Sequence, residues 1–173
     1  MRKFNYIMAG LHAAQAVAVL LLSKEFSLPI SGSFLKFNET NQSLEPASTT
    51  LFDLSLPLLL VVFFALSAAA HLYIATVYNK RYNEDLKRGI NKARWFEYSL
   101  SASTMMVAIS LLVGIYDFSS LLMIFALTAI MNLTGLVMEV HNQTTKKTNW
   151  LSYWIGCLAG VVPWIVIALY MWI

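Results

Sequence analysis

The segment LSLPLLLVVFFALSAAAHLYIATVY, residues 54–78, decides the fold, because it contains no charged side chain. A helix that crosses a membrane needs about 20 consecutive, mostly apolar residues. Further segments of this kind lie at about residues 4–23, 93–116, 119–140 and 150–173. We therefore predict an all-α membrane protein, one domain built as a bundle of five transmembrane helices.

The composition of the whole chain agrees with this prediction. Of its 173 residues, 58% are hydrophobic and only 12% are charged, whereas a soluble domain has roughly 25% charged residues. A soluble globular domain and a disordered chain are therefore both excluded. The net charge of +3 is best explained by basic loops beside a lipid bilayer, so we expect no nucleic-acid partner. The single cysteine, Cys157, leaves no possibility of an intrachain disulfide.

The basic residues predict the orientation in the cell membrane, because cytoplasmic loops carry an excess of lysine and arginine. Only Lys24 and Lys36 lie on one side of the predicted spans. All the others lie on the opposite side: Arg2, Lys3, Lys80, Arg81, Lys87, Arg88, Lys92, Arg94, Lys146 and Lys147. We expect a multi-pass protein with its N-terminus in the cytoplasm.

The connection at residues 24–53 is the longest and is extracellular in this orientation. It contains SLPISGSFLKF, in which a proline and a glycine precede the alternating apolar residues Phe34, Leu35 and Phe37. This pattern predicts a small β-hairpin.

Three ionisable groups fall inside predicted spans, where charges are costly and commonly functional. They are His12, His71 and Glu97, at similar depths in the cytoplasmic half of the bundle. Gln15 follows His12 by three residues and Ser101 follows Glu97 by four, which extends each polar stripe. These positions predict one hydrated polar cavity. Alternatively, Glu97 could pair with Arg94 near the membrane surface, and each histidine could be a hydrogen-bonded core residue.

The pair Gly156 and Gly160 in the last span has the spacing that allows two helices to approach closely. It would serve either a dimer interface or packing within the bundle.

Several motifs, in order along the whole chain, resemble the heliorhodopsin family. They are His12-x-x-Gln15, Ser27-Leu28-Pro29, His71 followed by Lys80-Arg81-Tyr82, RW-x-EYSLS at residues 94–101 and GC-x-AG-x-VPW at residues 156–164. The resemblance implies a light-sensing, retinal-binding membrane protein of the microbial rhodopsin type, which is neither an ion pump nor an enzyme. It also implies a homodimer formed through the fourth and fifth spans and the first extracellular loop. No motif indicates a signalling partner.

The resemblance further implies roles for individual residues. Glu97 would be the counterion of the protonated retinal Schiff base, which needs an anion nearby to keep its proton. His12, His71, Gln15 and Ser101 would surround the polar cavity, and Tyr98, Met105 and Trp164 would form the retinal wall. The family has seven helices and attaches retinal to a lysine in the seventh. None of the five spans here contains a lysine, and the chain stops directly after an apolar run. We therefore expect the first five helices of a seven-helix rhodopsin-like fold, with retinal bound by the full-length protein.

Two other functions fit the residues themselves. Histidines on separate helices are plausible axial haem ligands, so His12 and His71 could serve a haem-binding membrane redox protein. The polar groups could also only position the helices of a structural or partner-binding membrane subunit.

Overall fold

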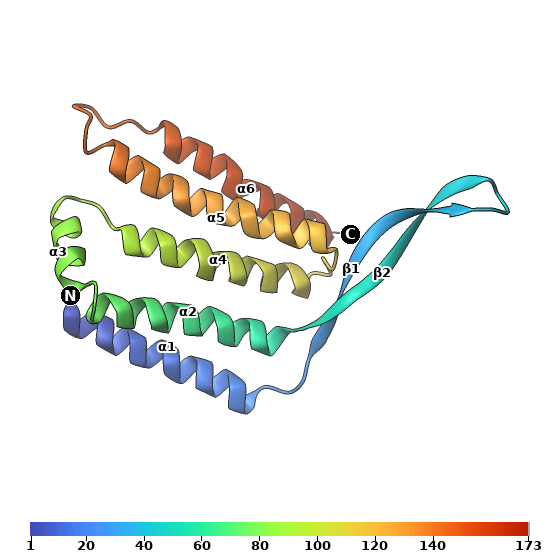
Figure 1. The fold of residues 1–173 in the computed structure, drawn as a ribbon, viewed down its shortest axis with the longest axis horizontal. Helices are drawn as coiled ribbons and strands as arrows, with labels where there is room; N and C mark the ends of the chain where they lie inside the picture. The colour runs from blue at the N-terminus through green and yellow to red at the C-terminus, as the bar shows by residue number, and fades with distance from the viewer. Residues whose placement is uncertain (173) are drawn as a thin grey trace.

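The structure, a computed structural model, describes residues 1–172 and is helical apart from one β-hairpin. The elements in chain order are α1 (Arg2–Leu22), β1 (Ser27–Asn38), β2 (Ser43–Ser55), α2 (Leu56–Ala75), α3 (Asn79–Lys87), α4 (Lys92–Leu112), α5 (Phe118–His141) and α6 (Leu151–Trp172). The five long helices lie side by side in the order α1, α2, α4, α5, α6 (Figure 1). The predicted helical bundle with a hairpin in the first long loop is thus confirmed.

Four of the long helices, α1, α2, α5 and α6, are long and apolar enough to cross a membrane. The third predicted span differs in composition. It forms α4, which has 21 residues but carries Lys92, Arg94 and Glu97 in its first two turns. Helix α4 lies in the middle of the row, and several of its hydroxyl side chains are buried against its neighbours. Their hydroxyls donate to carbonyls of the same helix, as Ser103 does to Ser99 at 2.7 Å. This lowers the cost of a polar helix inside the bundle.

Two helices end earlier than the apolar segments do. Helix α2 ends at Ala75, and Tyr78 then precedes the short helix α3, which lies between two of the predicted spans. Helix α4 ends at Leu112, because Gly114 adopts a φ of +93°, a conformation that favours glycine.

The hairpin is longer than the predicted one and extends well beyond the helices (Figure 1). Its strands are antiparallel and pair from Ser27 opposite Ser55 to Asn38 opposite Ser43. The base is fixed to the bundle, since the Ser31 N–H donates to the Tyr116 carbonyl at 2.9 Å. Next to it lies the apolar core, which includes Ile30, Leu56, Leu111, Ile115, Leu121, Ile124 and Ile167.

The glycine pair of α6 packs inside the bundle. A Cβ atom added at Gly156 would overlap Thr134 of α5, and one added at Gly160 would overlap Met131. The close-approach motif therefore joins α6 to α5 instead of leaving a surface for a second copy.

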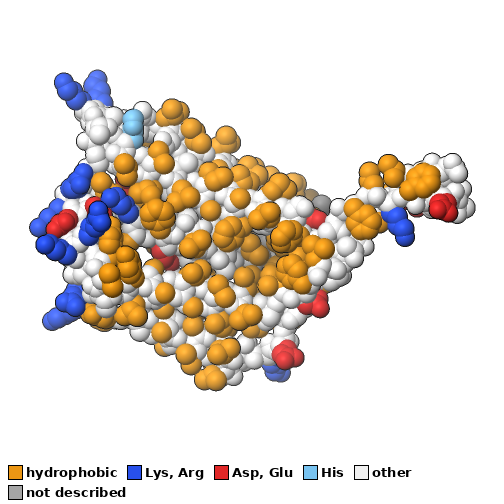
Figure 2. Space-filling model, viewed as in Figure 1, with side chains coloured by type: hydrophobic (Ala, Val, Ile, Leu, Met, Phe, Trp, Pro, Cys, Tyr) orange, Lys and Arg blue, Asp and Glu red, His pale blue; other side chains and the backbone are white. Residues whose placement is uncertain are grey.

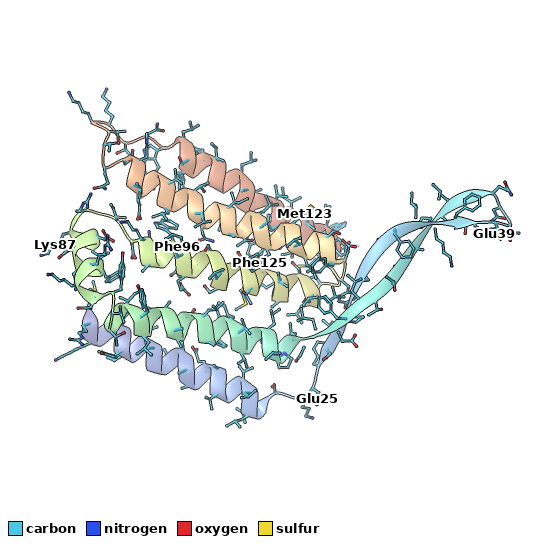
Figure 3. The ribbon with its side chains drawn as sticks, in the orientation of Figure 1. Glu25, Glu39, Lys87, Phe96, Met123 and Phe125 are labelled. Carbon is cyan, nitrogen blue, oxygen red and sulfur yellow. The ribbon has the colours of Figure 1, made fainter. Side chains whose placement is uncertain are left out.

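The basic side chains gather at the end of the bundle opposite the hairpin (Figure 2). In Figure 3, Lys87 of α3 lies at this end and Glu39 lies at the tip of the hairpin. The apolar side chains between the two ends cover the surface of the helices.

Candidate functional site

A cavity of about 660 Å³ lies among the long helices and contains most of the residues that the sequence singled out. His12 of α1, His71 of α2 and Glu97 of α4 line it together. Tyr98, Ser101, Met105 and Trp164 also line it. Gln15 does not, but it contacts His12 directly.

Glu97 lies at the centre of this arrangement. The Ser67 hydroxyl of α2, which is buried, donates to Glu97 Oε1 at 2.6 Å. The alternative pairing with Arg94 is wrong, because the Arg94 guanidinium binds Glu139 of α5 at 2.9 Å instead. The Glu97 carboxylate is half-buried. Among residues 1–172, no protein group donates a hydrogen bond to its other oxygen. It is thus a half-buried acceptor held by one hydroxyl.

The two histidines form a stacked pair. Their ring centroids are 5.5 Å apart and their planes differ by 15°. Nδ1 of His71 lies 2.8 Å from Asn5 Oδ1, and Nδ1 of His12 lies 2.9 Å from Gln15 Oε1. An amide oxygen only accepts, so each Nδ1 carries the hydrogen and each Nε2 is the acceptor in the neutral ring.

The model of the heliorhodopsin family matches residues 1–173. The chain belongs to the heliorhodopsin family. A comparison with curated proteins finds no match. Family membership supports a rhodopsin-type membrane photoreceptor, and full-length heliorhodopsins bind retinal.

Apart from an attaching lysine, the residues that line the cavity of this heliorhodopsin fit retinal. Its volume is within the ~300–1,000 Å³ of ordinary ligand pockets. Away from His12, His71 and Glu97 its wall is mostly apolar and includes Phe63, Met105, Met106, Ile109, Met131 and Trp164. Methionine and aromatic side chains suit a long unsaturated hydrocarbon. Within residues 1–172 no lysine lines the cavity.

Two residues of the heliorhodopsin site were missed in the sequence. Asn5 holds His71, and Ser67 holds Glu97. Both were detectable from helical spacing, since Asn5 precedes His12 by seven residues and Ser67 precedes His71 by four. A serine or asparagine in an apolar helix is common, however, and only the tertiary contact distinguishes these two.

Proposed function

We propose that this heliorhodopsin is a light-sensing, retinal-binding membrane protein in which Glu97 is the counterion of the retinal. The observation that supports this most directly is the hydrogen bond from Ser67 to Glu97, in a cavity whose wall is otherwise mostly apolar. The Glu97 carboxylate does not serve an ion pair with its basic neighbour Arg94, because Arg94 binds Glu139.

Retinal, when bound to a lysine, supplies the absorption of visible light and a buried positive charge. The chain's own residues then have separate tasks. The Glu97 carboxylate stabilises a nearby cation, and Ser67 stabilises the charged carboxylate by donating to it. Asn5 and Gln15 fix the rings of His71 and His12, whose Nε2 atoms can accept a proton. Tyr98, Met105 and Trp164 would form the wall around the hydrocarbon, and Ser101 adds a hydroxyl for bound water.

Glu97→Gln tests the counterion. The chain would be joined to the sixth and seventh helices of another heliorhodopsin and supplied with all-trans-retinal. We expect visible absorbance that moves to longer wavelength in Glu97→Gln, because the positive charge loses the anion that localises it.

The matched control is Glu139→Gln, which removes the carboxylate of α5, a side chain that does not line the cavity. Its absorbance should stay at the wild-type wavelength. Ser67→Ala should give a shift smaller than that of Glu97→Gln. A pigment that Glu97→Gln leaves unchanged would rule out the counterion role.

The same spectra examine the haem alternative. His12 and His71 face each other as stacked rings 5.5 Å apart, whereas two axial haem ligands point their nitrogens at the iron from opposite sides. A Soret band that responds to dithionite in the purified chain would support haem against our proposal. If single replacements of His12, His71 and Glu97 changed only stability, the purely structural role would be favoured.

We also propose that the end carrying α3 faces the cytoplasm and that the hairpin faces outward. The grouping of lysine and arginine at the α3 end supports this orientation (Figure 2). The hairpin tip carries the glycosylation sequences Asn38-Glu-Thr and Asn41-Gln-Ser, which provide a natural test. Expression in a eukaryotic cell should give a glycosidase-sensitive product that Asn38→Gln combined with Asn41→Gln abolishes.

We further propose that the protein forms a homodimer and that it does not pump ions. Large apolar side chains on α5 and α6 are exposed, including Leu122, Ile130, Leu158 and Ile165, and so is Phe37 of the hairpin. These surfaces are the fourth and fifth spans and the first loop that the family resemblance implies. Cross-linking in membranes should capture a dimer, and illuminated cells carrying the completed pigment should show no light-driven change in external pH.

A further inference from the structure

A second cavity, of about 390 Å³, lies between α2 and α4 on the side away from the candidate site. Helix α2 contributes Leu66 and Ala70 to it, whereas the adjacent Ser67 and His71 face the site cavity. Among the described residues, Glu97 alone lines both. We call this second cavity the α2–α4 groove; its apolar wall is formed by Leu66, Ala70, Ile74, Phe96 and Leu100.

The α2–α4 groove opens on the outer surface of the bundle. Tyr73, Phe96 and Leu100 on its walls are about half exposed. Phe96 lies on α4 near the α3 end in Figure 3, and Figure 2 shows red acidic atoms at the base of a hollow in the apolar surface. In a membrane, this surface contacts lipid.

The dimensions of the groove match one lipid chain. Its α4 wall runs from Lys92 to Leu100, which is about 12 Å at ~1.5 Å per residue. Half of the hydrocarbon core of a bilayer is ~15 Å thick. The groove therefore spans most of one leaflet, with its polar end at the level of the lipid headgroups.

That polar end carries one basic side chain. Lys92 and Tyr78 line it. Two carboxylates lie near the groove. Glu97 lines it five residues further along α4 and accepts from the Ser67 hydroxyl. Asp85 is buried and already accepts from the Tyr78 hydroxyl at 2.7 Å. Lys92 Nζ lies 3.7 Å from Asp85, while its side chain is 38% exposed. An ammonium group has three hydrogens to donate, so Lys92 can bind an external anion as well. The neighbouring helix α3 carries the exposed Arg81 and, about one turn further on, the exposed Glu84.

We propose that the α2–α4 groove binds one anionic phospholipid, with an acyl chain along Phe96 and Leu100 and the headgroup phosphate on Lys92. The groove combines an apolar wall that spans most of one leaflet with a positively charged side chain at its polar end. This combination distinguishes it from an ordinary lipid-facing surface. The binding does not depend on retinal or on the role of Glu97.

The test compares lipids bound to the purified chain in nanodiscs of phosphatidylcholine, with or without phosphatidylglycerol. Native mass spectrometry counts the lipids that stay bound to the protein after it is released from the nanodisc. We expect one retained phosphatidylglycerol in the wild type, and about fivefold weaker retention in Lys92→Gln, the usual effect of one lysine at a membrane surface. Lys147→Gln removes an equal charge from the α5–α6 connection at the same end and should retain phosphatidylglycerol like the wild type.

A second variant, Ala70→Phe, fills the groove without changing charge and should reduce retention of both lipids. Circular dichroism confirms that each variant is folded, and counting lipids per protein molecule makes the result independent of protein yield. Equal phosphatidylglycerol retention in wild type and Lys92→Gln, or equal loss in Lys147→Gln, would overturn the proposal. So would retention that Ala70→Phe leaves intact.

Discussion

At the hairpin end of the bundle, Ile30, Leu111 and Ile115 are completely enclosed by other apolar side chains. At the α3 end, the buried residues include Asn5, Ser67 and Asp85. The side chains at the hairpin end need no specific hydrogen-bond partners, because apolar groups only require close packing. Each of the three polar side chains at the second end has a hydrogen-bonded partner from another residue: His71, Glu97 and Tyr78 respectively.

The contrast shows a division of tasks along the same helices. The apolar end fixes where α2, α4, α5 and α6 lie relative to one another. The polar end then holds Glu97 in a space that the side chains do not fill, since Glu97 borders three separate cavities. A rigid packed end is what allows an open polar end to keep its geometry. The following predictions test this division.

Leu111→Ala should have the largest effect, because it removes a fully buried side chain from the apolar end. We expect the free energy of unfolding to fall by about 2–4 kcal/mol. The adjacent Leu112 is 64% exposed, so Leu112→Ala should cost less than about 0.5 kcal/mol. Denaturation in detergent micelles followed by circular dichroism measures both. Equal losses would mean that the apolar end does not determine stability.

Gly135→Ala should have the next largest effect, at the polar end. A Cβ atom at Gly135 would overlap the ring of Trp95, on which the Arg94 guanidinium stacks at 4.4 Å. The rigid ring cannot move without disturbing the ion pair between Arg94 and Glu139. We therefore expect the free energy of unfolding to fall by about 1–3 kcal/mol in the same assay. Gly10 of α1 has no atom near the corresponding position, and Gly10→Ala should be neutral or stabilising by up to ~1 kcal/mol. A neutral Gly135→Ala would show that this contact is loose.

Asp117 should make the hairpin end sensitive to acid. It caps α5, and the hydrogen bond from the Ser120 backbone N–H holds the pKa of Asp117 below its ordinary value. Because the folded pKa is the lower one, the stabilisation is complete above the unfolded pKa of about 3.9 and is lost as the pH falls below it.

Asp117→Ala should therefore lower the free energy of unfolding by about 1 kcal/mol at pH 7. Asp117→Asn keeps a capping oxygen and should remove mainly the acid-dependent part. The comparison needs unfolding midpoints at neutral and acidic pH. An acid response that persists in Asp117→Asn would have to come from another group.

Tyr78 should give the smallest effect, at the opposite end and in the opposite pH range. Burial, followed by the hydrogen bond to Asp85, raises the pKa of Tyr78 to about 12. Since the folded pKa lies above the unfolded value of about 10, the stabilisation is complete below pH 10 and is lost as the pH rises towards 12.

The ultraviolet absorbance of tyrosinate should show a late titration step that disappears in Tyr78→Phe. Tyr82→Phe, which changes a neighbouring ring on α3, should retain that step. Disappearance in both variants would mean that the step does not belong to the Tyr78–Asp85 pair.

Much of the site was predictable because its residues are unusual where they stand. His12, His71 and Glu97 are ionisable groups in apolar helices, and their similar depth predicted a shared cavity, in whose wall the structure places all three. The partners could not be found in this way. Helical spacing left a pair between Arg94 and Glu97 as an alternative, yet Arg94 binds Glu139 on α5, because the choice between two carboxylates depends on how α4 and α5 pack.

The sequence by itself determined the membrane bundle, the hairpin and the family of this protein. Each follows from local properties: the length of an apolar run, the alternation of side chains and the order of motifs along the chain. Only the tertiary structure decided that Ser67 holds Glu97, that α3 interrupts the connection after α2, and that Gly156 and Gly160 pack against α5. These features join residues that are distant in sequence, and a polar or small residue carries no local signal of the partner it will meet.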